Sequence, residues 1–184
     1  NMLDFKRIIT IVIIILLIIG VTTGIYFYIN KDEKEQEIIP QEEITEEQMR
    51  QTIVSLYFKS EEKLIPEARL IDVKELLENP YRKIIEMLIE GPKSEKLEGT
   101  IPEGTKINKI EKESDTLIID FSKEFIENHK GGEVQEKLTI NSIVNTVTEL
   151  TEINSVRILI DGEKDKSFKD EKINFVEEFK RIST

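Results

Sequence analysis

The stretch TLIIDFSKEF, residues 116–125, carries the clearest signal of how this chain folds. It opens with an apolar, β-branched run that is typical of a buried strand, and the run stops at Asp120. From Ser122 onward the spacing becomes helical, with Phe125 as the next apolar residue. A strand that passes directly into a short helix predicts a fold in which helices and strands pack together.

Asp120 and Glu124 raise the question of whether this junction is an active site. The two carboxyls of a glycosidase lie roughly 5–9.5 Å apart across a sugar-sized cleft, and four residues at a strand–helix junction can meet that distance. The chain contains no tryptophan to form a sugar platform. Ser122 is a good N-cap, Glu124 suits the first turn of a helix, and Asp120 can accept from the same amides. We therefore expect no catalytic residues, and keep a peptidoglycan hydrolase using Asp120 and Glu124 as the alternative.

Upstream of the junction, the sequence predicts three strands and one helix. Asn79 is a natural N-cap, Pro80 fits the first helical position, and Gly91-Pro92 is a stop. Ser114-Asp115 marks the tip of a hairpin that ends in the quoted strand. The predicted elements are strands at residues 52–58, 68–73 and 105–112, with a helix between the last two.

Downstream of the junction, Gly131-Gly132 ends the short helix and a longer one follows over residues 133–150, with a broad apolar stripe. Residues 155–160 form a buried strand that ends in an Asp161-Gly162 turn. Near the end, KINFVEEFKRI favours an edge strand over an amphipathic turn. The whole pattern predicts an α/β fold, a small two-layer sandwich of helices on a mixed β-sheet.

The N-terminal part predicts a membrane anchor. Residues 8–29 contain no charged side chain, and about 20 apolar residues span a bilayer. Bulky aromatics close the segment where a cleaved signal would have small residues. Lys6 and Arg7 precede it and an acidic stretch follows, so the positive-inside rule keeps the N-terminus in the cytoplasm. We expect a cytoplasmic stretch (1–7), a transmembrane anchor (8–29), an acidic linker (30–51) and an extracytoplasmic domain (52–184).

Composition limits the partners of the exported part. Residues 31–184 hold 24 basic and 36 acidic side chains, a net charge of −12 that repels nucleic acid. The chain has no cysteine, which excludes a lipidated anchor, a thiol nucleophile and a cysteine zinc site. We therefore expect no nucleic-acid partner and no cofactor.

Two further parts of the sequence contain residue types that occur in active or metal sites. His129 is the sole histidine and lies next to a glycine pair, a position more typical of a loop residue than of a base or ligand. The segment beginning at Asp161 alternates acids with Glu163 and Asp165, as calcium loops do. An EF-hand needs glycine sixth and glutamate twelfth, and lysines stand there instead, at 166 and 172. We expect neither a metal site nor a histidine-based active site.

These motifs, in this order and spacing, resemble the GerMN domain, also called the sporulation and spore germination domain. The resemblance covers about residues 52–181. Its motifs are Gly91-Pro92, Ile101-Pro102-x-Gly104-Thr105, Ile119-Asp120-Phe121-Ser122-x-x-Phe125, Gly132 with Glu136, the 143–148 helix segment, and Val156-x-Ile158-x-Ile160-Asp161-Gly162.

The resemblance implies a membrane-attached, extracytoplasmic, non-enzymatic domain that acts in sporulation or spore germination. It also implies a fold similar to ring-building modules of the channel between mother cell and forespore, whose intermembrane space is then a candidate location. Other envelope or sporulation proteins are the expected partners, and self-assembly and a general cell-envelope role stay open. Many members of the family carry a lipidated cysteine or two tandem copies, and this chain has neither.

Overall fold

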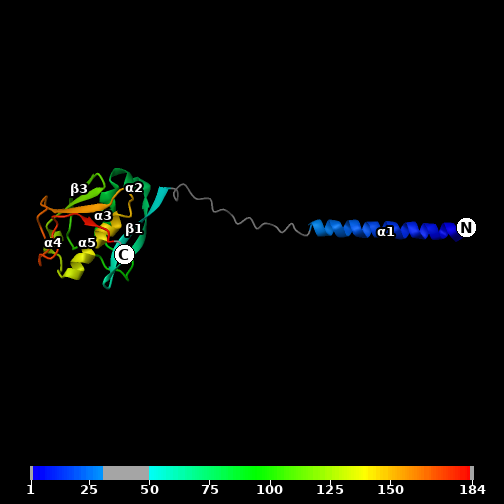
Figure 1. Cartoon of the computed structure of the whole chain (residues 1–184), viewed down its shortest axis with the longest axis horizontal. Coiled ribbons are helices and arrows are strands. Elements are labelled where there is room, and N and C mark those ends of the chain that lie inside the picture. Colours follow the sequence, from blue (N-terminus) through cyan, green and yellow to red (C-terminus); the bar gives the residue numbers. More distant parts are fainter. Residues whose placement is uncertain (1, 31–49, 183–184) are drawn as a thin grey trace. The chain divides into compact units, whose positions relative to one another are not determined.

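The structure is a computed structural model, which describes residues 2–30 and 50–182. The chain divides into two compact units, one within residues 1–43 and one within residues 44–184 (Figure 1). Among the described residues, the first unit contains one helix and the strands lie in the second.

The N-terminal unit is the helix α1, Met2–Asn30. Its segment Ile9–Tyr28 is long and apolar enough to cross a membrane, and no other helix in the described part of the chain is. The hydroxyl groups of Thr22 and Thr23 donate to the carbonyls of Ile18 and Ile19, at 2.9 and 2.8 Å. These two hydroxyl groups are thus hydrogen-bonded within the helix itself.

The second unit begins with a long antiparallel hairpin, β1 (Gln51–Ser60) and β2 (Lys63–Asp72), which forms a sheet of its own. The second strand begins five residues earlier than expected, despite Pro66. Pro66 lies opposite Tyr57, whose amide bonds to Thr146 and whose carbonyl accepts from Ser142. The backbone groups of Tyr57 thus bond to helix residues and not to β2. Pro66, which has no N–H group, therefore stands at a position where the pairing of the hairpin requires none.

Two helices follow the hairpin: α2 (Val73–Glu78), which was not predicted, and α3 (Pro80–Glu90), which was. The side chain of Asn79 accepts from the amide of Arg82 at 2.9 Å, which confirms the predicted cap of α3. The short helix α2 has no buried residue, so it leaves no apolar period in the sequence. Its cap is Asp72, which accepts from the amide of Lys74.

The larger sheet has the order β3-β4-β5-β6, with β4 and β5 parallel and the other pairs antiparallel. The hairpin of β3 (Ile107–Glu113) and β4 (Thr116–Phe121) turns at Ser114, whose φ is 56°. The strand β5 spans Ser155–Ile160, and β6 has only two residues, Phe179–Lys180. The mixed sheet was thus predicted correctly, and its last strand is much shorter than expected.

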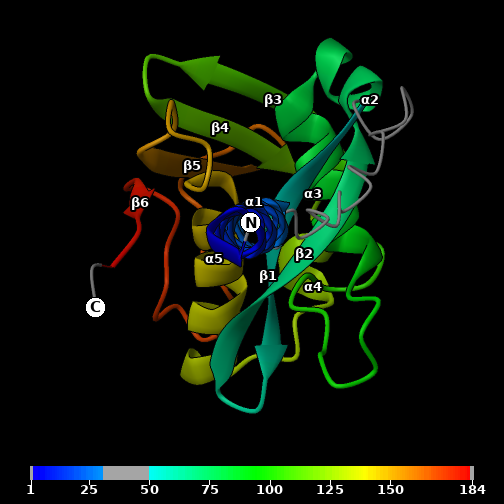
Figure 2. The same cartoon turned by 90° about the vertical axis from the view of Figure 1, so that its right-hand side faces the viewer.

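The parallel connection from β4 to β5 runs through α4 (Glu124–Glu127) and α5 (Glu133–Val147). Figure 2 shows α5 alongside β1, with β3, β4 and β5 as neighbouring strands. Helix α5 buries its stripe between the hairpin and the larger sheet, and Ile143 and Val147 are fully buried. The domain is therefore an α/β sandwich, as expected, in which a separate hairpin extends the strand layer.

The segment between β5 and β6, residues 163–178, is called here the C-terminal strap. It has no regular strand of its own, but two of its aromatic side chains, Phe168 and Phe175, are buried. Their rings pack on Phe125 with centroids 5.6 and 6.1 Å away. The Phe125 ring in turn stacks on that of Phe121, with 4.6 Å between centroids. The strap therefore packs against the junction between β4 and α4.

Candidate functional site

A groove with a volume of about 810 Å³ lies near the junction. It is bordered by the loop of residues 98–104, the turn of residues 128–130 and the first half of α5. The buried residues in its lining are Pro102, His129, Leu138 and Thr139. Its charged lining residues are Lys59, Glu98, Glu103 and Lys130, of which Lys59 pairs with Glu98 at 3.0 Å. The groove thus combines apolar contacts with both signs of charge.

His129 is held at both ring nitrogens. Its Nδ1 accepts from the amide of Gly131 at 2.9 Å, so the proton lies on Nε2, which donates to Thr139 Oγ1 at 2.9 Å. The Thr139 hydroxyl donates onward to the carbonyl of Thr100 at 2.8 Å. Burial lowers the pKa of His129, and the nearby Lys169 adds to that effect. The ring is therefore neutral, and its hydrogen bonds join the two loops of the groove to α5. This structural role agrees with the prediction that His129 is a loop residue.

Asp120 and Glu124 are each engaged with a different part of the fold. Asp120 Oδ1 accepts from the amide of Gly162 at 2.9 Å and so ties β4 to the turn that follows β5. A hydrogen bond from the Ser122 hydroxyl, with a smaller backbone contribution, lowers the pKa of Glu124. Neither residue lines the groove. A general acid needs the opposite, a raised pKa inside a cleft.

The predicted cap at Ser122 is wrong in its detail. No side chain caps α4, and the residue before the helix is Lys123. Ser122 Oγ instead accepts from the amide of Lys106 at 3.0 Å, while the Ser122 amide donates to the Lys106 carbonyl at 2.9 Å. The serine therefore extends the pairing of the β3–β4 hairpin rather than starting the helix, and Asp120 bonds to the Gly162 turn rather than to helix amides.

The acidic segment after β5 forms a tight turn. Asp161 has a φ of 48° and accepts from the side-chain amide of Asn108 at 3.0 Å, while Glu163 pairs with Lys166 at 2.8 Å. Within the described ranges, no group of three or more histidine, cysteine, aspartate or glutamate residues could hold a metal ion. Lys166, which occupies the sixth position of this segment, thus pairs with one of its acids.

Sequence reasoning did not identify Glu136 as a buried charge. Glu136 is fully buried on α5, and neither of its carboxylate oxygens has a hydrogen-bond partner among the described residues. Burial raises its pKa to about 7, and the nearby Asp170 carboxylate adds to the shift. The helical spacing contains the signal, because Glu136 lies four and seven residues before Ile140 and Ile143 of the apolar stripe.

Comparison with known proteins gives a family match over most of the second unit. The family described as "Germane: Sporulation and spore germination" matches residues 55–166. No curated protein sequence matches the chain.

Solved structures share the fold. The tandem GerMN domains of the sporulation protein GerM from Bacillus subtilis align over 73% of this chain and 47% of theirs, with a TM-score of 0.59 and 22% identity. The chain therefore spans about half the length of that structure. A putative lipoprotein from Clostridium perfringens aligns over 74% of this chain and 92% of its own, with a TM-score of 0.50 and 28% identity.

The first GerMN domain of the same Bacillus subtilis protein aligns over 72% of this chain and 94% of its own, with a TM-score of 0.50 and 20% identity. One GerMN domain is thus covered almost completely by the second unit. The family match extends over more than half of the chain and includes the junction at Asp120, the groove loops and α5. This chain belongs to the Germane family of sporulation and spore germination domains.

Proposed function

We propose that this protein is a single-pass membrane protein whose extracytoplasmic domain binds other envelope proteins during sporulation or spore germination, without catalysis of its own. One observation carries the proposal. A domain of the sporulation and spore germination family follows a helix, α1, whose segment Ile9–Tyr28 can span a bilayer. The division into residues 1–7, 8–29, 30–51 and 52–184 is part of the proposal.

Electrostatics supports export of the domain and limits its partners. Lys6 and Arg7 precede the apolar segment, which favours a cytoplasmic N-terminus. The exported part has a net charge of −12, so its partners are expected to be proteins with basic or apolar contact surfaces rather than nucleic acid. The intermembrane space between mother cell and forespore is a location that fits this topology.

The groove supports binding better than hydrolysis. Its histidine has both nitrogens engaged, and one of its two acids, Glu98, is paired with Lys59. Asp120 and Glu124 bond to separate groups outside the groove, which gives the peptidoglycan hydrolase alternative no geometric support. Loops that carry backbone groups and both signs of charge are suited to contact with another protein.

Cysteine labelling tests the topology cleanly, because the natural chain has no cysteine. Glu95→Cys, at an exposed position of the second unit, is expected to react with a membrane-impermeant maleimide in intact cells. Asp4→Cys, which leaves Lys6 and Arg7 in place, serves as the matched control and is expected to react only after lysis. Labelling of both variants only after lysis would contradict the exported topology.

Crosslinking tests the interaction half of the proposal. The full chain, crosslinked in sporulating cells and purified in detergent, is expected to recover envelope or sporulation proteins. The same chain without residues 2–30 is the control, and its recovery of those proteins should fall because it is no longer held at the membrane. Recovery of background proteins alone from the full chain would count against an interaction role.

A further inference from the structure

Glu136 is a buried carboxyl group to which no described group donates a hydrogen bond. Its neighbour is the Asp170 carboxyl, and a hydrogen bond between these two acids requires one of them to be protonated. The exposed fraction of Glu136 is 0%, and neither of its oxygens has a hydrogen bond from the residues that the structure describes. Buried polar groups are hydrogen-bonded in the great majority of cases, and a buried charge without a partner is costly. Neither the groove nor the proposed function uses this glutamate.

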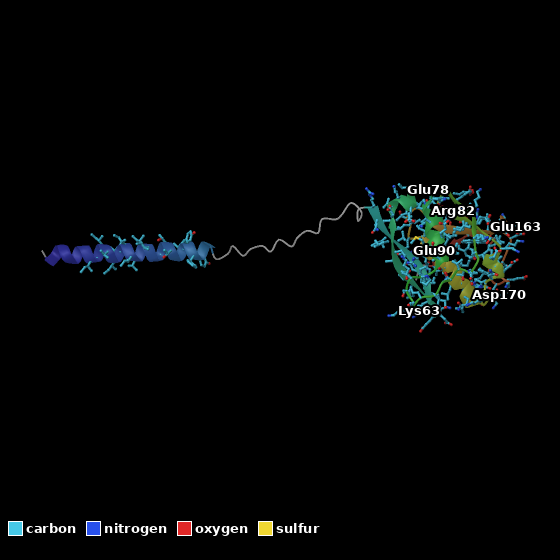
Figure 3. The ribbon with its side chains drawn as sticks, turned by 180° about the vertical axis from the view of Figure 1, so that it is seen from behind. Lys63, Glu78, Arg82, Glu90, Glu163 and Asp170 are labelled. Atoms are coloured by element: carbon cyan, nitrogen blue, oxygen red, sulfur yellow. The ribbon has the colours of Figure 1, made fainter. Side chains whose placement is uncertain are left out.

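The C-terminal strap folds back on itself close to Glu136. The amide of Phe168 donates to the carbonyl of Ile173 at 3.1 Å, and the amide of Phe175 donates to the carbonyl of Lys166 at 2.9 Å. Asp170 lies at the tip of this fold-back and is exposed at the domain surface (Figure 3). The strap is therefore a hydrogen-bonded fold-back whose tip, residues 169–172, carries two lysines and two acids.

Three contacts hold the strap tip against α4 and α5. Lys172 pairs with Glu133 in the first turn of α5 at 3.3 Å, and Lys169 Nζ donates to the carbonyl of Glu127 at 2.6 Å. The ring of Phe168 packs on the neutral ring of His129, with 4.5 Å between centroids. The two lysine contacts are exposed and stabilise the closed strap little. Closure therefore rests on the buried rings of Phe168 and Phe175 and on the groups beneath the tip, Glu136 among them.

We propose that protonated Glu136 acts as a latch, which keeps the C-terminal strap closed on α5, and that its ionisation releases the strap. The charged groups around Glu136 favour this behaviour. Asp170 on the strap and Glu133 on α5 repel a Glu136 carboxylate, and Lys172 on the strap attracts it only partly, since it also pairs with Glu133. His129, from the loop before α5, is neutral and offers no charge to Glu136.

Release uncovers an apolar surface. Opening of the strap exposes Phe168, and with it the side of His129 that this ring covers. The strap thus links protonation of one buried side chain to the exposure of an aromatic surface beside the groove. This regulation goes beyond the proposed function and does not depend on it.

The direction of the pH dependence follows from the two states of Glu136. When the strap is closed, burial and Asp170 raise the pKa of Glu136 to about 7, and in the open state it returns toward the ordinary value of 4.5. Below pH 4.5 the carboxyl is protonated in both states, so the latch is fully present. Between these values the opening equilibrium should rise about tenfold for each pH unit, and it should level off above about pH 7.

Hydrogen exchange of the full chain in detergent micelles tests the latch. Protection of the Phe168, Glu171 and Phe175 amides, corrected for intrinsic exchange, is measured from pH 5 to 8. We expect protection to fall steeply up to about pH 7 in the wild type. Glu136→Gln should keep the protection high and constant over this range, since the amide mimics the neutral acid.

Glu133→Gln is the matched control, because it removes a carboxylate from the same helix turn and leaves Glu136 in place. It should retain the full pH dependence. Equal protection of the wild-type strap at every pH would overturn the proposal, and so would an unchanged pH dependence in Glu136→Gln. If that variant does not fold, carboxyl NMR of the wild type decides: titration of Glu136 near pH 7, together with broadening of strap resonances, supports the latch, and titration near 4.5 overturns it.

Discussion

Arg69 and Glu67 form an ion pair that is almost buried and joins the hairpin to the end of α3. The Nε of Arg69 lies 2.5 Å from Glu67, and its Nη2 donates to the carbonyl of Gly91 at 2.7 Å. Glu67 also accepts from the amides of Lys93 and Ser94. Burial opposes ionisation of Glu67, but these amides and Arg69 outweigh it and lower the pKa of Glu67. Each partner is therefore fully satisfied.

Arg69→Met should destabilise the domain by about 3–5 kcal/mol, because it leaves Glu67 buried without its counter-charge. The measurement is urea denaturation of the second unit, followed by circular dichroism. Arg82→Met is the control, since Arg82 and Glu86 are a partly exposed pair 3.7 Å apart and should contribute about 0–1 kcal/mol. Equal losses of stability in the two variants would show that the Arg69 network contributes no more to the stability of the domain than a partly exposed ion pair does.

For individual residues, the sequence predicted where a residue lies in the fold better than which groups it contacts. Asp120 was correctly placed where a strand ends, but its partner, Gly162, is 42 residues away and no local pattern marks it. His129 was expected in a loop, yet its burial depends on Phe168 from the distant strap. Glu136 could have been found, because it shares the helical stripe of α5. Long-range contacts of this kind come from tertiary packing and leave no periodicity in the chain.

Helix α5 connects the two sheets of the domain. Ile143, Val144 and Val147 are buried, and the polar Ser142 and Thr146 between them bond to the backbone of Tyr57. The helix thus covers the free edge of β1 with hydroxyl groups and fills the core with its aliphatic groups. A sheet edge that is covered in this way is protected from pairing with other chains.

Val147→Asp should unfold the domain, because it buries a charge where the exposed fraction is 0%. Val134→Asp, on the same helix, should change the melting temperature little, since Val134 is 48% exposed. Thermal unfolding of both variants, followed by circular dichroism, gives the comparison. A folded Val147→Asp domain with wild-type melting temperature would show that the buried face of α5 is assigned wrongly.

The cap of α3 should matter more than that of α2. Asn79→Ala removes the acceptor for the Arg82 amide and should cost about 1 kcal/mol, in a helix that buries Ile84, Ile85, Met87 and Leu88. Asp72→Ala removes the cap of α2, which buries no residue, and should cost clearly less. Urea midpoints of the two variants check the order, and the reverse order would contradict it.

At the element scale, the capped and periodic segments were predictable. Helices α3 and α5 and strands β1, β3, β4 and β5 lie close to the ranges that their patterns indicated. Two of the failures share a physical cause, which is that tertiary contacts override local preference. Pro66 is tolerated in β2 because α5 takes the backbone groups of Tyr57, and the chain end forms a strap because Phe168 and Phe175 bind the core.

At the scale of the whole molecule, the chain joins two units of different composition. One is an apolar helix able to span a membrane, and the other is a folded domain of the sporulation and germination family. No disulfide stabilises the domain, since the sequence contains no cysteine. The acidic stretch around residue 40 lies outside the described residues, so the linker stays a prediction.

The most direct test of the central claim is the count of heat-resistant, germination-competent spores after deletion of the gene in the organism that encodes it. We expect the count to drop when the gene is deleted. The full chain and its Asp120→Ala variant should restore it, and the chain without residues 2–30 should not, because the role requires the anchor and not Asp120 chemistry. A normal count with normal germination in the deletion strain would contradict a role in either process.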